Sequence, residues 1–208
     1  MKSTSVLDSI REAVRTVFRG IAKLLNRISG GRITPNSVTY TSLLGHIGIA
    51  YLIATNQLVI AGVLLVMFGL MDTLDGELAR LQNRASNKGM FLDSVTDRIK
   101  EVMVYIGIAW YFVTQLDPYY AVWAVAACGV AVTVSYLNAW GEVVTADLPK
   151  SHTKNKAFRN GFMTYDVRIF FIVLGLVTGY LDVAVIAVAV LSCVTALQRF
   201  MNVYRRLS

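Results

Sequence analysis

Charged residues are scarce in this chain: Asp, Glu, Lys and Arg together make up 16% of its 208 residues. Soluble globular domains carry about 25% of these residues. The apolar residues instead gather in long runs, and the mean hydropathy is +0.55. An ordinary soluble domain is therefore excluded. The runs approach the roughly 20 residues that a helix needs to cross a bilayer.

Cysteine is almost absent, which excludes a disulfide framework. The two cysteines, Cys128 and Cys193, lie inside apolar stretches and match no disulfide or metal-ligand spacing. We interpret both as small packing residues. The N-terminal region also lacks a compact apolar core followed by a small-residue cleavage site, so a cleaved signal peptide is not expected.

The apolar runs predict an all-α integral membrane protein with six transmembrane helices. The expected spans are residues 36–54, 58–81, 89–113, 119–141, 163–180 and 182–203. Lys and Arg are missing from the connections at 55–57, 114–118 and 178–182, and they concentrate near both termini and in the two longer loops. Because cationic residues near span ends favour the cytoplasm, both termini and the longer loops are expected on the cytoplasmic side of the cell membrane.

Residues 6–28 differ from the spans, because Arg and Lys are interleaved there with apolar residues at helical spacing. This pattern predicts an amphipathic helix that lies in the membrane interface. Residues 1–208 are expected to form one domain, with the N-terminal helix in 1–32 and a six-helix bundle in 33–208. The net charge of +7 indicates a basic face toward anionic lipid headgroups or an anionic substrate, and no nucleic-acid binding is expected.

Four carboxylates interrupt the second and third spans. Asp72 and Asp75 fall on one face of the second span. Asp93 and Asp97, at positions i and i+4, fall on one face of the third. Because consecutive spans are antiparallel, both pairs lie toward the cytoplasmic end and can face each other. A carboxylate at the bilayer centre costs at least about 2.5 kcal/mol, so cations must offset the charge of this cluster.

Two kinds of cation are available to the cluster. Arg80, Arg98 and Lys100 can offset part of its charge, and a buried ion-pair network with Arg80 and Arg98 is the purely structural alternative. Oxygen ligands without His or Cys are those that hard divalent cations such as Mg²⁺ prefer. A pair of such ions would create a two-metal site suited to phosphoryl chemistry.

The acidic segment also carries a longer motif. Asp72-x-x-Asp75-Gly76-x-x-Ala79-Arg80, eight further residues, and Gly89-x-x-x-Asp93-x-x-x-Asp97 resembles the fingerprint of the CDP-alcohol phosphotransferases at every fixed position. The resemblance implies transfer from CDP-diacylglycerol or a related CDP-lipid to a hydroxyl acceptor, with release of CMP. It further implies two Mg²⁺ or Mn²⁺ ions, with Asp97 as the catalytic base as well as a ligand. The implied metal ligands are Asp72, Asp75, Asp93 and Asp97.

The same resemblance implies a surface that binds the CDP-lipid. The family's contacts, carried over position by position, fall on Asn36, Thr39, Gly76, Ala79, Arg80, Ser86 and Gly89. The lipid tails would stay between helices while a soluble acceptor enters from the cytoplasm. A homodimer is expected, as for other members of the family.

The second half of the chain indicates the acceptor. Ser135-Tyr136, Arg168 and Gln198-Arg199 resemble the phosphatidylinositol-phosphate synthases within the family. This implies that Arg168 and Arg199 bind the phosphate of inositol phosphate. Where that subgroup has a basic KARAE-like run, residues 138–142 read Asn-Ala-Trp-Gly-Glu, which removes one expected cation. Glycerol 3-phosphate and unphosphorylated alcohols such as serine therefore stay open as acceptors.

Other interpretations stay open as well. Arg168 can pair locally with Asp166, and Arg199 can extend to the membrane interface. Four loop cations either compensate for the missing charge or mark the cytoplasmic side: Lys150, Lys154, Lys156 and Arg159. Two rival functions use acidic residues in membranes. They are prenyl transfer, whose enzymes usually need more spans and lack this motif, and ion-coupled transport, which favours a midplane site between matching halves.

Overall fold

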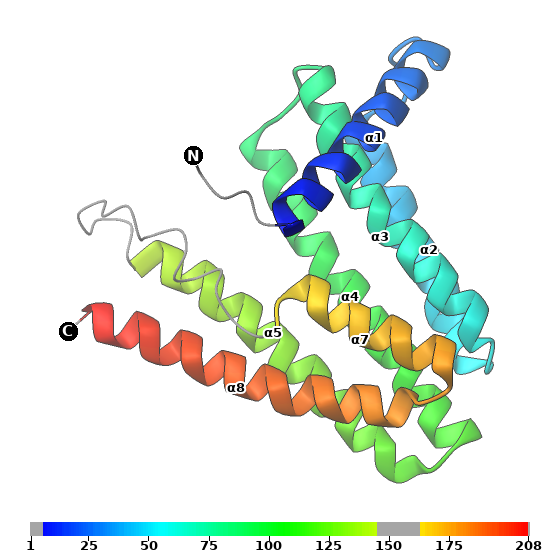
Figure 1. The fold of residues 1–208 in the computed structure, drawn as a ribbon, viewed down its shortest axis with the longest axis vertical. Coiled ribbons are helices and arrows are strands. Elements are labelled where there is room, and N and C mark those ends of the chain that lie inside the picture. The colour runs from blue at the N-terminus through cyan, green and yellow to red at the C-terminus, as the bar shows by residue number, and fades with distance from the viewer. Residues whose placement is uncertain (1–5, 145–162, 208) are drawn as a thin grey trace. The chain divides into compact units, whose positions relative to one another are not determined.

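Helices make up the fold. The computed structural model describes residues 6–144 and 163–207, with the side chains of 6–15 and 206 left out of the description. Throughout this range the regular structure is helical and no strand occurs, so the predicted all-α class is confirmed (Figure 1). The elements are α1 Val6–Ile28, α2 Pro35–Ala54, α3 Leu58–Leu81, α4 Asn87–Gln115, η1 Pro118–Tyr120, α5 Ala121–Val144, α7 Tyr165–Thr178 and α8 Leu181–Leu207.

Several of these helices are suited to a membrane. Within the described range, four segments have both the length and the hydropathy to cross one: Pro35–Ala54, Leu58–Leu81, Pro118–Val144 and Leu181–Arg205. Helix α4 is long enough but is interrupted by charge, and α7 has 14 residues. Helix α7 is shorter than the predicted span 163–180 because Thr164 is its N-cap and Gly179, with φ of 81°, ends it in the left-handed conformation. The described part of the chain therefore contains four helices long and apolar enough to cross a membrane, as expected of an integral membrane protein.

The chain divides into two compact units. Unit 1 comprises residues 1–48 and 64–100, and unit 2 comprises residues 49–63 and 101–208. Helices α2, α3 and α4 each contribute one segment to each unit.

Unit 1 is organised around the turn that leads from α1 into α2. The Thr34 backbone N–H donates to Ser37 Oγ at 3.1 Å, and the Ser37 backbone N–H donates to Thr34 Oγ1 at 3.2 Å. This reciprocal pair of hydrogen bonds caps α2. The first residue of α2 is Pro35, which suits this position because a backbone N–H there would have no partner within the helix. A small apolar core then joins α1, α2 and α3: Ala22, Val38, Leu74 and Leu78. The turn and this core fix the start of α2 against the part of α3 that carries Asp72 and Asp75.

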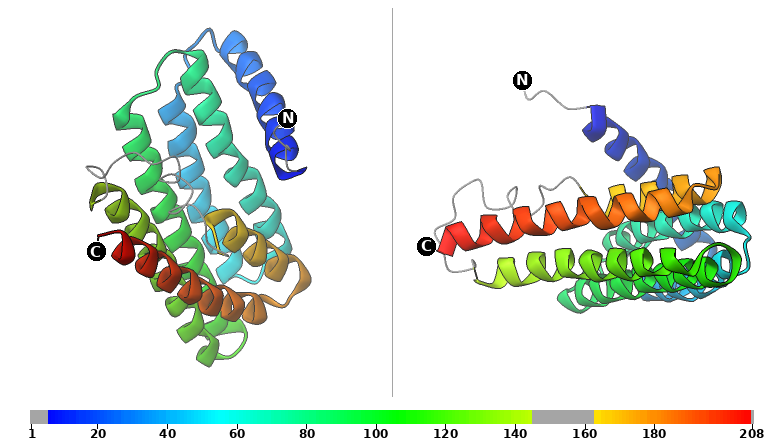
Figure 2. Two further views of the ribbon diagram at one scale, coloured as in Figure 1. Left: turned by 60° about the vertical axis from the view of Figure 1, so that its left-hand side comes forward. Right: turned by 90° about the horizontal axis from the view of Figure 1, so that it is seen from below.

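Unit 2 is built mainly on α8. Helix α8 lies alongside α5 and packs against α7, as both ribbon views show (Figure 2). Gly175 allows the tight turn between α7 and α8, because a Cβ there would stand 2.6 Å from Ala184 Cβ and 3.0 Å from Leu181 Cα. Buried apolar residues such as Ile172 and Val185 fill the space between these helices. Two arginines also lie inside this unit.

Candidate active site

The four motif carboxylates belong to unit 1. Asp72 and Asp75 come from α3, while Asp93 and Asp97 come from the first part of α4. Asp75 is buried and the other three are half-buried. Asp72 and Asp97 approach a common point, because both contact the ammonium group of Lys100. The helical faces expected from the spacing of the motif therefore do direct carboxylates of α3 and α4 toward one another.

Lys100 is a cation that lies within this cluster. Its Nζ lies 2.6 Å from Asp72 Oδ1 and 2.8 Å from Asp97 Oδ1, and its side chain has no exposed surface. The interaction with Asp97 spans one turn of α4, and the interaction with Asp72 reaches across to α3. One ammonium group therefore connects the two acidic helices.

Arg80 does not serve the cluster in this way. Its Nη1 donates to Glu77 Oε1 at 2.6 Å, and the Arg80 side chain is 61% exposed. Glu77 also lies 3.5 Å from Arg19 of α1. The ion-pair network of Asp residues with Arg80, which the sequence offered as a structural alternative, is therefore wrong for this arginine. Its predicted contact with the CDP-lipid is compatible with its exposure.

Thr39 positions one of the carboxylates. Its Oγ1 donates to Asp75 Oδ2 at 2.6 Å, and both residues are buried. Hydrogen bonds to ionised acceptors are about twice as strong as neutral ones, so this contact fixes the rotamer of Asp75. The sequence assigned Thr39 to CDP-lipid binding, and that assignment stays a prediction; the structure adds the contact with Asp75.

The carboxylate oxygens of the cluster are ligands that fit a hard divalent cation, although the side chains do not surround a common metal position in this structure. Among the described residues, no three His, Cys, Asp or Glu side chains converge as a ready metal site. Asp93 Oδ1, however, is buried and accepts no hydrogen bond from the described part of the chain. A buried carboxylate oxygen without a donor is costly, and an added cation would satisfy it. The oxygen-only chemistry suits Mg²⁺ or Mn²⁺.

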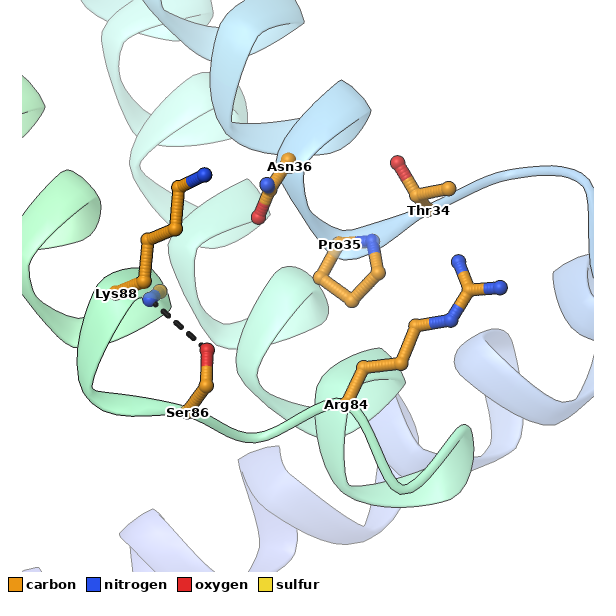
Figure 3. Close-up of a pocket in the computed structure, with 7 residues that line it drawn as sticks. Thr34, Pro35, Asn36, Arg84, Ser86 and Lys88 are labelled. Atoms are coloured by element: carbon orange, nitrogen blue, oxygen red, sulfur yellow. Dashed lines mark hydrogen bonds between the residues drawn. The ribbon is translucent and has the colours of Figure 1, made fainter.

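A pocket opens at the end of unit 1, where α2 begins and α3 is connected to α4. Three predicted CDP-lipid contacts, Asn36, Ser86 and Gly89, line it. Ser86 caps α4, since its Oγ accepts the Gly89 backbone N–H at 3.1 Å (Figure 3). Arg84 and Lys88 flank the pocket from opposite sides (Figure 3). The pocket therefore offers positive charge and a helix N-terminus to an anionic group.

Gly76 and Ala79 lie on α3 outside the lining of that pocket. A Cβ on Gly76 would meet nothing nearer than Arg80 Nη2 at 4.0 Å. The surface beside Gly76 is therefore open enough for a ligand to approach the backbone, as expected from the motif. Arg84 and Lys88 were missed by the sequence reasoning, because cations in a loop between spans are equally expected from membrane orientation.

Arg168 lies in unit 2 and is 1% exposed. Its Nε donates to Glu101 Oε1 at 2.8 Å and its Nη2 donates to Glu101 Oε2 at 3.2 Å, while Nη1 donates to the Met163 carbonyl at 3.2 Å. The alternative in which Arg168 pairs locally with Asp166 is therefore wrong, since the partner is Glu101 on α4. A carboxylate in an apolar helical segment was a signal that a buried cation must face it.

Arg199 is also buried, at 4% exposure. The alternative in which it extends to the membrane interface is therefore wrong. Its Nη1 donates to the Val134 carbonyl of α5 at 3.3 Å, and its Nε has no acceptor among the residues that the structure describes. Met163 links the two arginines: its carbonyl accepts from Arg168, and its N–H donates to Thr195, one turn before Arg199. An unsatisfied guanidinium donor suits an anionic ligand.

The four loop cations lie outside the described residues. These are Lys150, Lys154, Lys156 and Arg159. Asn138, which replaces an expected cation, is on α5, and its Oδ1 is buried without a donor in the described range.

Comparison with known proteins agrees with these features. Residues 32–199 match the family described as CDP-alcohol phosphatidyltransferase, and the chain belongs to that family. It is 35% identical over 135 residues to the phosphatidylinositol phosphate synthase of Corynebacterium glutamicum, an alignment that covers 64% of this chain and 60% of that protein. It is 28% identical to the archaetidylinositol phosphate synthase of Pyrococcus horikoshii, over 97% of this chain and 98% of that protein.

Solved structures support the fold. The phosphatidylinositol phosphate synthase of Mycobacterium tuberculosis with CDP-DAG bound has a TM-score of 0.78 and 24% identity, covering 91% of this chain and 94% of that chain. The same protein in complex with manganese and citrate has a TM-score of 0.77 and 24% identity, covering 90% of this chain and 88% of that chain. At this identity the similarity establishes a common helical fold.

Proposed function

We propose that this member of the CDP-alcohol phosphatidyltransferase family transfers a phosphatidyl group from a CDP-lipid, such as CDP-diacylglycerol, to a hydroxyl group of inositol phosphate, with release of CMP. The observation that carries the proposal is the convergence of Asp72 and Asp97, from two helices, on one buried point in unit 1. The names of the relatives support the choice of acceptor. Glycerol 3-phosphate is the alternative acceptor.

The carboxylates would hold two divalent ions, Mg²⁺ or Mn²⁺, through Asp72, Asp75, Asp93 and Asp97. When bound, these ions neutralise phosphate charge and act as Lewis acids. The manganese complex of the relative and the buried, unsatisfied Asp93 Oδ1 support this assignment. Thr39 would keep Asp75 in place.

Asp97 is the proposed general base. It takes the proton of the acceptor hydroxyl as that oxygen forms a bond to the phosphorus nearest the lipid. The bond from that phosphorus to the bridging oxygen breaks, and CMP leaves with the electron pair. No covalent enzyme intermediate is required, because phosphoryl transfer depends mainly on position and charge.

The pocket in Figure 3 is proposed to bind the CDP part of the lipid substrate. Asn36, Ser86 and Gly89 line it, and Thr39, Gly76, Ala79 and Arg80 complete the set expected from the motif. Arg84 and Lys88 add positive charge for the pyrophosphate.

Arg168 and Arg199 are proposed to bind the phosphate of the acceptor. Arg199 retains a buried guanidinium N–H without an acceptor in the described range. Arg168 uses three donors on Glu101 and Met163, so within the described residues one N–H on each Nη atom is left for a ligand. Guanidinium groups suit a phosphate dianion better than they suit the neutral hydroxyl groups of serine or glycerol.

We also propose how the enzyme lies in the membrane. Helices α2, α3, α4, α5, α7 and α8 would form six spans of one domain over residues 1–208, with α1 in the interface. Both termini and the active site would face the cytoplasm, and the protein would act as a homodimer. The distribution of Lys and Arg and the helix bounds support this arrangement.

A CMP-release assay tests the function. Detergent-solubilised protein is incubated with CDP-diacylglycerol and Mg²⁺ or Mn²⁺, and inositol phosphate, glycerol 3-phosphate, inositol and serine are supplied in turn. We expect CMP release with inositol phosphate and little with inositol, which differs from it by the phosphate. Preference for glycerol 3-phosphate would favour the alternative acceptor. Absence of CMP release with every acceptor, from protein that is folded, would refute the proposal.

A further inference from the structure

Lys100 is an unusual component of an acidic cluster that is expected to hold divalent ions. We propose that Lys100 is an internal cation of this cluster: it holds Asp72 and Asp97 in place without metal, and it weakens metal binding by competing for the same oxygens. The inference rests on the metal site of the proposed function. It assigns to Lys100 a positioning role that the family motif, which ends at Asp97, does not contain.

The geometry shows that the ammonium group occupies oxygens needed for coordination. Lys100 Nζ is 2.6 Å from Asp72 Oδ1 and 2.8 Å from Asp97 Oδ1. A carboxylate binds Mg²⁺ at about 2.0–2.1 Å through its oxygen lone pairs, and Asp72 Oδ1 already uses one of these to accept a hydrogen bond from Lys100. An ion at either oxygen would therefore lie next to the ammonium group and be repelled by it.

The surroundings of Lys100 make this competition effective. The side chain has no exposed surface, so water screens its charge poorly. Two other cations of unit 1, Arg19 and Arg80, pair with Glu77 and are more than half exposed. Lys100 therefore supplies charge inside the cluster where those arginines do not.

The charge balance explains why Lys100 does not replace the metal. Lys100 pairs with two of the four motif carboxylates, Asp72 and Asp97, so it compensates the charge of the cluster only in part. Asp93 contributes a buried oxygen without a donor in the described range. The lysine thus stabilises the metal-free protein only in part, and the remaining charge attracts divalent ions.

Metal affinity and thermal stability provide the test. Wild type, Lys100→Met and Arg19→Met are purified in detergent, stripped with EDTA and titrated with Mn²⁺ at one pH, with free Mn²⁺ followed by electron paramagnetic resonance. We expect Lys100→Met to bind Mn²⁺ about tenfold more tightly than wild type, a change of about 1.4 kcal/mol. Without metal it should unfold at a lower temperature. Arg19→Met removes an equal charge beside Glu77 and should change neither value.

Three more variants make the outcome decisive. Lys100→Arg keeps the charge and should retain the weaker, wild-type affinity, whereas Lys100→Gln should behave as Lys100→Met does. If Lys100→Met does not fold, the comparison of Lys100→Arg with Lys100→Gln replaces it as the test. Asp93→Asn should lower Mn²⁺ affinity, because it removes a proposed ligand. Unchanged or weaker Mn²⁺ binding in both neutral Lys100 variants, with an effect of Asp93→Asn, would overturn the inference and leave the proposed function intact. Absence of Mn²⁺ binding in every protein would overturn both.

Discussion

The two units bury charge of opposite sign. In unit 1, the four motif carboxylates outnumber the neighbouring cations, of which the buried Lys100 pairs with Asp72 and Asp97. Among the described residues of unit 2, the buried arginines outnumber the buried carboxylates: Arg168 and Arg199 are buried, and Glu101, which pairs with Arg168, is the buried acid. Buried charge without a full complement of partners destabilises a fold, so each excess indicates a ligand of the opposite sign. Unit 1 is suited to cations, and unit 2 is suited to an anion.

The strongest test of the negative cluster is Asp97→Asn. Loss of a general base typically lowers turnover by about 10²–10⁴-fold, and the amide cannot take the proton. Binding of the CDP-lipid should be retained. The measurement is CMP release together with CDP-lipid binding, and Asp166→Asn on α7 is the matched control, since Asp166 is exposed. Turnover at the wild-type rate in Asp97→Asn would exclude its role as base.

The positive cluster is tested by Arg168→Ala and Arg199→Ala. We expect each to raise KM for a phosphorylated acceptor by about 10- to 100-fold, from lost charge-assisted hydrogen bonds of about 1.5–3 kcal/mol. The KM for the CDP-lipid should change less. Steady-state kinetics with each substrate varied separately checks this split. Equal acceptor KM values in both variants and wild type would exclude the two arginines from acceptor binding.

Glu101→Gln also tests the buried positive charge of unit 2. The substitution removes the ionic partner of Arg168 and so increases the net positive charge buried in this unit. Removing one partner of a buried pair costs about 3–5 kcal/mol when nothing replaces it. A phosphorylated acceptor would replace the lost charge. We therefore expect a lower unfolding temperature that is partly restored by inositol phosphate, measured by thermal unfolding with inositol as the control ligand. Equal restoration by inositol would argue against a phosphate site.

A moderate effect is expected from Thr39→Val. The substitution keeps the size of the side chain but deletes the hydrogen bond to Asp75. Loss of a bond of about 1.5 kcal/mol corresponds to roughly tenfold weaker Mn²⁺ binding if Asp75 is a ligand. Thr41→Val is the control, because its hydroxyl group bonds the Ser37 carbonyl on its own helix. The two variants should differ in a Mn²⁺ titration; identical affinities would disconnect Thr39 from the metal site.

The smallest effects are expected at the pocket of Figure 3. Arg84→Gln and Lys88→Gln should each raise KM for the CDP-lipid by about two- to fivefold, because exposed charges contribute at most about 1 kcal/mol. The effect should shrink as ionic strength rises, since salt screens these charges. Kinetics at low and high salt check the trend, and a salt-independent change would indicate a structural cause.

Helix bounds were largely predictable, because apolar runs and turn residues are local features. The predicted helix at 6–28 coincides with α1, and the predicted span 58–81 coincides with α3. The predicted span at 163–180 was too long, because α7 begins after its N-cap Thr164 and ends before Gly179. Local patterns determine where a helix can exist, while caps determine where it ends.

Side-chain partners were less predictable, because they depend on which helices pack together. Arg168 is two residues from Asp166, yet it pairs with Glu101, 67 residues away. Lys100 was recognised only as one of three possible counter-charges, and its contact with both Asp72 and Asp97 required the packing of α3 on α4. The acidic motif was visible from its spacing alone, because helical periodicity places its members on one face.

The pair between Lys100 and Asp72 also bears on how the chain enters the membrane. Helices α3 and α4 are consecutive and are joined by a short connection at residues 82–86, so this pair closes a helical hairpin. Helix α4 alone would carry its charges into lipid at about 2.5–3.5 kcal/mol for each Asp or Lys at the centre. In the hairpin, the ion pair compensates the charge of Asp72 on α3 with that of Lys100 on α4. Biogenesis should therefore favour partitioning of α3 and α4 from the translocon as a joined pair rather than one after the other.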